Sequence, residues 1–192
     1  MIEKTIAFVK EKLRGAEAGH DWFHIERVYK NLLHDIADSK FHNGDEQIGP
    51  QTARQFLLEN NVNENVIEKV IKIIENISFK GGIQREYTSR ELDIVQDADR
   101  LDAIGAIGIA RTFNYGGFKN RELYNPEINP NLNMTKEEYK NSTAPTINHF
   151  YEKLLLLKDK MNTPKGKELA QQRHEFMEQF LAQFYKEWNG EM

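Results

Sequence analysis

The sequence predicts an all-α protein, and three observations support this fold class. Apolar residues recur at intervals of three and four along most of the chain, which is the period of an amphipathic helix. The apolar fraction of 39% and the mean hydropathy of -0.70 are low for a compact sheet protein but suit long helices with charged outer faces. Helix-start signals, in which Ser or Thr precedes Glu by three residues, also occur. At 192 residues, the chain is long enough to bury a core in one domain.

Composition narrows the chemistry that the protein can perform. The chain has no cysteine, which excludes disulfides, thiolate zinc sites and a cysteine nucleophile, so any metal must bind His, Asp or Glu. Its net charge of -4 leaves no basic footprint for long nucleic acid. No apolar run reaches transmembrane length, and the first residues lack the hydrophobic region of a signal peptide. We therefore expect a cytoplasmic protein that binds neither long nucleic acid nor a membrane.

The first half of the chain contains four expected helices. The first spans about 2–13, and the second follows Asp21, an N-cap candidate, and presents His24 on its apolar face. The third covers 50–58 and the fourth covers about 64–77. The residues of the fourth helix that we expect to face inward are Val66, Val70, Ile73, Ile74 and Ile77.

The third quarter of the chain combines helix signals with a long connection. Capping-box spacing at 88–91 opens a helix that we expect to continue through Gly105, where Gly105 and Gly108 predict close packing. Residues 114–134 are rich in Asn, Pro and Gly and are too long for an ordinary connection. Because this segment also contains aromatic residues, we expect it to pack as a lid-like loop. A second capping box lies at 135–138.

The C-terminal residues predict two more helical segments. One follows an interruption at Pro145 and reaches about Met161, and the other begins at Pro164 and ends near Trp188. Most of an aromatic-rich stripe on the last helix is expected in the core: Leu169, His174, Phe176, Met177, Phe180, Leu181 and Phe184.

The densest run of potential metal ligands ends an apolar segment at 32–38. His34 and Asp35 are adjacent there, and Asp38 follows one helical turn later. Imidazole nitrogen suits a transition metal and carboxylate oxygen suits a harder ion, so the pair indicates a mixed site. A lone histidine on an apolar face, such as His24, is more often a core residue than a ligand, so its role depends on this pair.

Asp99 is the best candidate for a further ligand. It lies one turn from Val95 and from Ala103, which places it on the apolar side of its helix. Buried carboxylates are rare unless they are paired or bind metal. We expect the nearby Asp97 and Asp102 to cap or pair with neighbouring groups instead.

The spacing between His24 and His34 is a geometric anomaly. Ten helical residues rise about 15 Å, whereas both rings must place a nitrogen within about 2.1 Å of one metal. Residues 29–31 contain no proline or glycine that would break a helix. Either the chain doubles back there or a segment is missing between about Lys30 and Leu32, and we favour a missing segment.

Several cationic side chains are candidates for binding an anion. Lys40 and His42 follow the metal motif in an aperiodic loop that we expect at the mouth of the site. Lys80 precedes two glycines. This segment either binds an anion through Lys80 and backbone amides or simply caps the preceding helix. Three further candidates, for which a position on a helix surface is the alternative, are Arg111, His149 and Lys153.

Three local contexts resemble the H…HD…D signature of the HD-domain superfamily, in particular its bacterial YpgQ/YedJ-type subgroup. They cover 19–28 (GHDWFHIERV), 32–42 (LLHDIADSKFH) and 97–105 (DADRLDAIG). The match extends through 148–153 to the C-terminal helix, so it covers essentially the whole chain. The family normally has about one more helix between the first two contexts. This is the same interval in which one straight helix cannot bring His24 and His34 to a common metal.

The resemblance implies an HD-domain helical bundle with a core over about 18–113 and a C-terminal extension over about 135–188. It implies a metal-dependent phosphohydrolase that uses one divalent ion, Mn²⁺ or Mg²⁺, and water to hydrolyse a nucleotide or another phosphorylated small molecule. The implied metal ligands are His24, His34, Asp35 and Asp99. The implied catalytic residues are Asp38, Lys40 and His42, and the substrate-binding candidates are Lys80, Arg111, His149 and Lys153. Assembly as a homodimer is left open.

Two alternatives to this hydrolase stay open. In the first, the same four ligands form a structural clamp or a polar cluster in a non-catalytic, ligand-sensing module. A purely structural site has no use for the extra carboxylate of Asp38 or for cations at an open edge, and this favours the hydrolase. The second is a phosphodiesterase acting on a cyclic nucleotide or a dinucleotide, which is chemically close and separable only by assay.

Overall fold

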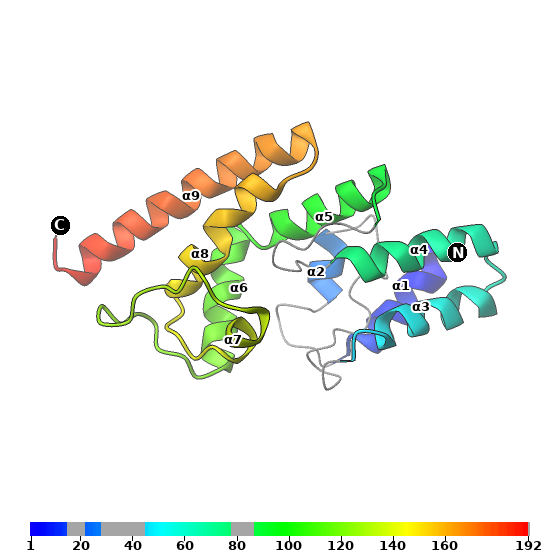
Figure 1. Cartoon of the computed structure of the whole chain (residues 1–192), viewed down its shortest axis with the longest axis horizontal. Coiled ribbons are helices and arrows are strands. Elements are labelled where there is room, and N and C mark those ends of the chain that lie inside the picture. Colours follow the sequence, from blue (N-terminus) through cyan, green and yellow to red (C-terminus); the bar gives the residue numbers. More distant parts are fainter. Residues whose placement is uncertain (15–21, 28–44, 78–86, 192) are drawn as a thin grey trace. The chain divides into compact units, whose positions relative to one another are not determined.

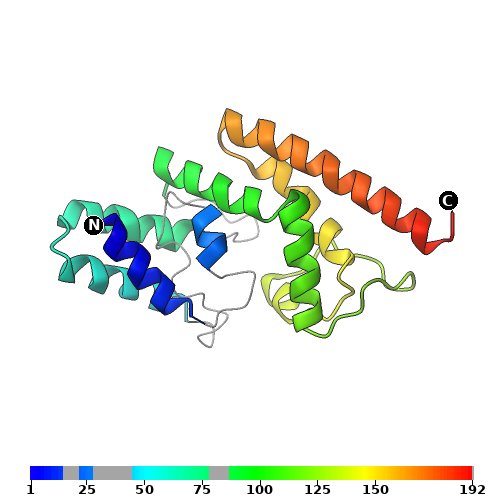
Figure 2. The same cartoon turned by 180° about the vertical axis from the view of Figure 1, so that it is seen from behind.

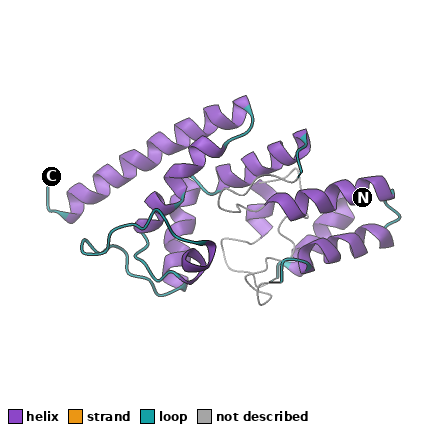
Figure 3. Cartoon of the chain, in the orientation of Figure 1, coloured by secondary structure: helices purple, strands orange, loops and turns teal. Residues whose placement is uncertain are grey.

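The computed structural model describes residues 1–14, 22–27, 45–77 and 87–191. This part of the chain is helical and contains no strand (Figure 3), which confirms the all-α prediction. None of its helices has the length and apolar composition needed to cross a bilayer. The chain divides into two compact units, Met1–Gln96 and Asp97–Met192. The single domain remains a prediction, and so does the missing segment near Lys30, which lies outside the described residues.

The N-terminal unit is built from α1 (Ile2–Lys12), α2 (Trp22–Arg27), α3 (Ile48–Glu59) and α4 (Glu64–Ile77). Helices α3 and α4 lie side by side (Figure 1), and α1 lies against them in the reverse view (Figure 2). One buried cluster joins all four helices: Val9, Ile25, Ala53, Phe56, Leu57, Ile67, Ile71 and Ile74. The expected helices of this half are therefore confirmed within the described residues.

Helix α4 has the predicted bounds, and three of the residues expected to face inward, Ile73, Ile74 and Ile77, are buried. Val66 was expected to point inward, and this is wrong because the residue is 48% exposed. Ile67 and Ile71, which were not predicted to face inward, are also buried, and with Ile74 they recur every three or four residues. Because each helical step turns by about 100°, Val66 faces away from the core that the next residue enters.

Helix α5 (Arg90–Asp102) begins with a cap one residue later than the predicted box. The Ser89 hydroxyl accepts a hydrogen bond from the amide of Leu92 at 3.1 Å. The helix ends before Gly105, so the prediction of a helix continuing through this residue is wrong. Gly105 has a φ of +73°, which glycine adopts without strain, and it starts α6 (Gly105–Phe118) in a new direction.

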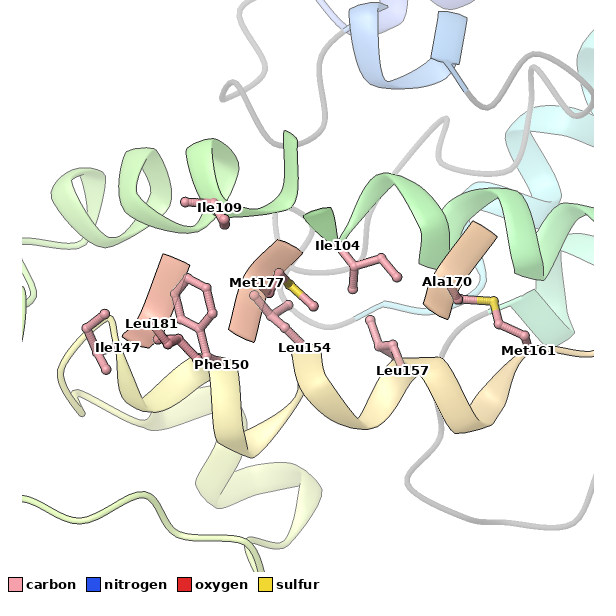
Figure 4. Close-up of a cluster of buried hydrophobic side chains, with 10 residues drawn as sticks. All are labelled: Ile104, Ile109, Ile147, Phe150, Leu154, Leu157, Met161, Ala170, Met177 and Leu181. Atoms are coloured by element: carbon pink, nitrogen blue, oxygen red, sulfur yellow. The ribbon is translucent and has the colours of Figure 1, made fainter. Parts of the chain in front are cut away.

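The C-terminal unit continues with α7 (Lys136–Asn141), α8 (Asn148–Glu152), the 3-10 helix η2 (Leu154–Lys160) and α9 (Pro164–Trp188). The last helix has the predicted bounds, and its first turn is capped by the side chain of Thr163. One buried cluster joins α6, α8, η2 and α9 (Figure 4): Ile104, Ile109, Ile147, Phe150, Leu154, Leu157, Met161, Ala170, Met177 and Leu181. Phe176, predicted in this core, is 48% exposed.

The long connection begins at residue 119, later than the predicted 114, because α6 continues to Phe118. Close packing holds this last turn in place, since a Cβ on Gly116 would lie 2.2 Å from the hydroxyl of Thr146. The connection itself is pinned to the segment around α8 by hydrogen bonds from the amides of Thr146 (2.8 Å) and Ile147 (3.1 Å) to its carbonyl groups. Tyr124 of the connection packs against aromatic rings of α9, as predicted, whereas Phe118 at the end of α6 is 62% exposed. The role of the connection as a lid remains a prediction.

Candidate functional site

The structure describes five of the residues predicted for the site and leaves six outside. The predicted residues outside the described ranges are His34, Asp35, Asp38, Lys40, His42 and Lys80. Those described are His24 in the N-terminal unit and Asp99, Arg111, His149 and Lys153 in the C-terminal unit.

His24 lies on α2 and is only 1% exposed, beside the fully buried Ile25. A buried imidazole is costly unless its nitrogens have a hydrogen-bond or metal partner. Across the ranges that the structure describes, no three His, Asp or Glu side chains gather into a metal-binding group. Two of the four predicted ligands fall outside those ranges, so this result does not bear on the predicted metal centre. The donor set itself, two imidazoles and two carboxylates, fits a divalent ion.

Asp97, near the end of α5, is a buried structural carboxylate. Its Oδ1 accepts a hydrogen bond from the amide of Asn162 at 2.8 Å, and its Oδ2 accepts two from the amide and hydroxyl of Thr163, both at 2.8 Å. The side chain therefore orders the turn that starts α9. This confirms the expectation that Asp97 caps a neighbouring segment.

Asp102 is also buried, and it forms an ion pair with Arg111 of α6. The Nη1 atom of Arg111 lies 2.5 Å from the Asp102 carboxylate and 3.2 Å from its backbone oxygen. The guanidinium thus links the end of α5 to α6, which gives Arg111 a structural role whether or not it contacts substrate. The expected pairing of Asp102 is confirmed.

Asp99 lies between these two structural carboxylates in the sequence, on the side of the helix opposite to Asp97. Two helical steps turn by about 200°, so Asp97 and Asp99 point in nearly opposite directions. Asp99 is partly exposed, whereas Asp97 is only 3% exposed because the turn before α9 covers it. The geometry thus assigns the buried structural roles to Asp97 and Asp102, whereas Asp99 is less buried than its place on the apolar side predicted, and its role as a metal ligand stays a prediction.

The structure brings two predicted substrate-binding residues, His149 and Lys153, together at the ring of Tyr139. The hydroxyl of Tyr139 lies 3.3 Å from Nδ1 of His149, and the two rings stack with centroids 5.9 Å apart. The Nζ atom of Lys153 lies 5.9 Å from the centroid of the same tyrosine ring. Sequence reasoning missed Tyr139, because a contact between α7 and α8 has no periodic signature in the sequence.

The surroundings of Tyr139 keep its hydroxyl protonated. Burial raises the pKa of Tyr139 above its usual range, and the nearby carboxylate of Glu152 raises this pKa further. The guanidinium of Arg121 opposes the shift, and it is itself held by a hydrogen bond of 2.6 Å to the carbonyl oxygen of Ser142. Tyr139 is therefore a neutral phenol with a proton to donate, beside an imidazole and an ammonium group.

Comparison with known proteins places this chain in a family. No family model matches it. The uncharacterized protein YpgQ of Bacillus subtilis is 35% identical over 216 residues, covering 98% of this chain and 94% of that protein. An HD-superfamily hydrolase of Bacillus thuringiensis is 45% identical in its crystal structure, with a TM-score of 0.73 and coverage of 98% and 96% of the two chains. The structure of Bacillus subtilis YpgQ in complex with ADP has a TM-score of 0.74 at 31% identity, over 97% and 94% of the chains. This chain belongs to the HD superfamily of hydrolases, in the bacterial group that includes YpgQ.

Proposed function

We propose that this protein is a divalent-metal-dependent phosphohydrolase that cleaves a phosphoanhydride or phosphoester bond of a nucleotide. The observation that carries the proposal is the full-length relationship to an HD-superfamily hydrolase. A nucleotide as substrate is supported by the complex of the related YpgQ with ADP. It is further supported by the imidazole and ammonium groups that gather at Tyr139, because such groups bind phosphoryl oxygens.

His24, His34, Asp35 and Asp99 are the residues that would hold the metal ion. Buried imidazole nitrogen combined with carboxylate oxygen fits Mn²⁺ or Mg²⁺, and Mn²⁺ accepts such mixed ligands more readily. When bound, the ion supplies Lewis acidity to the phosphoryl group and to water. The remaining steps depend on side chains of the chain itself.

Asp38 is assigned to the attacking water. Its carboxylate would orient the water and accept its proton as the new bond to phosphorus forms and the bond to the leaving oxygen breaks. Lys40 and His42, with Lys80 as a weaker candidate, would neutralise negative charge that moves onto the leaving group. These assignments rest on the resemblance of 32–42 to the family motif.

His149 and Lys153 are assigned to the phosphate groups of the substrate. They lie one helical turn apart, since the amide of Lys153 donates to the carbonyl oxygen of His149 at 3.1 Å. Both therefore present a nitrogen from one short segment, and that segment is held by the buried Phe150 and Leu154. This arrangement suits a chain of phosphates, which offers several oxygens in a row.

The experiment that tests this function measures phosphate and pyrophosphate release from a panel of nucleoside triphosphates with Mn²⁺ or Mg²⁺. Asp35→Ala and a chelated sample are run beside the wild type. Release that disappears in both controls supports the hydrolase, and the product identifies the bond that breaks. Absence of release from wild-type protein that has demonstrably bound metal, for every nucleotide and also for cyclic nucleotides and dinucleotides, would favour the ligand-sensing module instead.

A further inference from the structure

We propose that Tyr139 is a positioning residue for His149: its hydroxyl donates to Nδ1 of His149 and so keeps the proton of the neutral ring on Nε2. The same tyrosine ring positions the ammonium group of Lys153. The inference rests on the proposed function in one respect, namely that these two residues contact a phosphoryl group.

The backbone holds Tyr139 in place through the capping box of α7. The hydroxyl of Thr135 accepts the amide proton of Glu138 at 3.2 Å, and the carboxylate of Glu138 accepts the amide proton of Thr135 at 2.7 Å. Tyr139 follows directly, with its amide bonded to the carbonyl oxygen of Thr135 at 3.0 Å. A reciprocal cap fixes the first turn of a helix, so it also fixes the direction from which the tyrosine approaches α8.

The hydrogen bond between the two rings selects one tautomer of His149. A neutral imidazole has one protonated and one bare nitrogen, and a partner at one nitrogen decides which is which. The Tyr139 hydroxyl lies 3.3 Å from Nδ1, where a protonated phenol can donate or accept; in the proposed arrangement it donates, Nδ1 accepts and Nε2 carries the hydrogen. Stacking at an interplanar angle of 29° also restricts rotation of the imidazole about its side-chain bonds. The result is an N–H donor with a set identity and direction.

Lys153 depends on the same aromatic ring in a different way. Its ammonium nitrogen lies 5.9 Å from the ring centroid, within the range at which the negative face of an aromatic ring attracts a cation. This attraction needs the ring but does not need the hydroxyl. The two functions of Tyr139 can therefore be separated by removing first the hydroxyl and then the ring.

The direct test is nitrogen NMR of the imidazole rings of the metal-free protein, at a pH where His149 is neutral. The resonances of His149 are assigned from their loss in His149→Gln. The wild type should show a proton on Nε2 and a hydrogen-bonded Nδ1, and Tyr139→Phe should shift Nδ1 toward the value of a nitrogen without that bond. Tyr151→Phe, which removes a tyrosine hydroxyl bonded to Tyr185 at 3.2 Å, should leave His149 unchanged. A wild-type proton on Nδ1, or an unchanged Nδ1 in Tyr139→Phe, would overturn the proposal.

Kinetics give the second readout. Losing one hydrogen bond should lower kcat/KM by about 3- to 10-fold in Tyr139→Phe, chiefly through KM, because the phosphate charge is present before the reaction. Tyr139→Leu, which also removes the ring that attracts Lys153, should lower it further. Equal kcat/KM in wild type and Tyr139→Phe would contradict the positioning role. Should the wild type hydrolyse nothing, the proposed function fails, whereas the NMR result still decides the tautomer.

Discussion

Replacing Asp97 by Asn tests whether the end of α5 and the start of α9 are held together by one carboxylate. The change keeps the size of the side chain but removes its charge and turns one acceptor oxygen into an NH₂ donor. Both oxygens of Asp97 accept hydrogen bonds, one from Asn162 and two from Thr163. In either orientation of the asparagine side chain, its NH₂ group would therefore face the amide N–H of Asn162 or of Thr163.

The magnitude follows from these contacts. A hydrogen bond to a charged acceptor contributes about 1.5–3 kcal/mol, and a buried donor left without a partner is penalised by about 1–3 kcal/mol. Asp97→Asn loses at least one of three bonds at a site that is 3% exposed, so the free energy of unfolding should fall by about 2–4 kcal/mol. Asp97→Ala, which leaves both amides unpaired, should lower it by at least as much.

Tryptophan fluorescence offers a suitable assay, because the chain has two tryptophans and only Trp188 lies in the C-terminal unit. In a Trp22→Phe background, urea unfolding reports the unit that contains Asp97. Asp159→Asn, the same change at an exposed position of η2, is the matched control and should alter the free energy of unfolding by less than about 0.5 kcal/mol. An Asp97→Asn variant as stable as this control would refute the structural role of the carboxylate.

Three further predictions concern other contacts of the C-terminal unit. Arg111→Ala leaves the buried carboxylate of Asp102 without its cation and should lower the free energy of unfolding by about 1–3 kcal/mol. A variant of unchanged stability but raised KM would instead make Arg111 a substrate ligand. Gly108→Ala should destabilise by about 1–3 kcal/mol in urea unfolding, because its Cβ would lie 2.3 Å from a backbone carbonyl oxygen; a neutral change would contradict this close approach. Hydrogen bonds from Thr135 lower the pKa of Glu138 below its usual value. The capping box should therefore be intact at a pH above that usual value and be lost as the pH falls through the lowered pKa. Amide-exchange protection of residues 135–139, relative to the intrinsic rate at each pH, measures this loss, and protection that does not fall on acidification would contradict the prediction.

The sequence was sufficient to predict most helices of the fold. Helix α4 and helix α9 have the expected bounds because strong periodicity coincides with clear start and stop residues. The break at Gly105 was missed because a helical pattern continues on both sides of it, and only the backbone conformation reveals the turn. Val66 was wrongly expected to be buried. It and its neighbour Ile67 are both β-branched and both fit an apolar stripe, and tertiary packing chooses between them.

For the candidate site, the sequence indicated residue types better than contacts. Asp97 and Asp102 were expected to cap or pair with neighbouring groups, and the structure has them in such bonds, while the ligand role of Asp99 stays a prediction. His149 and Lys153 were identified as candidates, but their common partner Tyr139 was not. That contact depends on how α7 meets α8, and this depends on the long connection between α6 and α7, whose course no local pattern specifies.

The most direct test of the central proposal is a titration of metal-free protein with Mn²⁺, in which bound metal and nucleotide hydrolysis are measured in the same samples. If His24, His34, Asp35 and Asp99 hold a catalytic ion, hydrolysis should rise in proportion to the first Mn²⁺ bound per chain, and Asp99→Asn should lose both binding and activity. Full activity in the metal-free protein, or wild-type binding and activity in Asp99→Asn, would contradict the proposed metal-dependent mechanism.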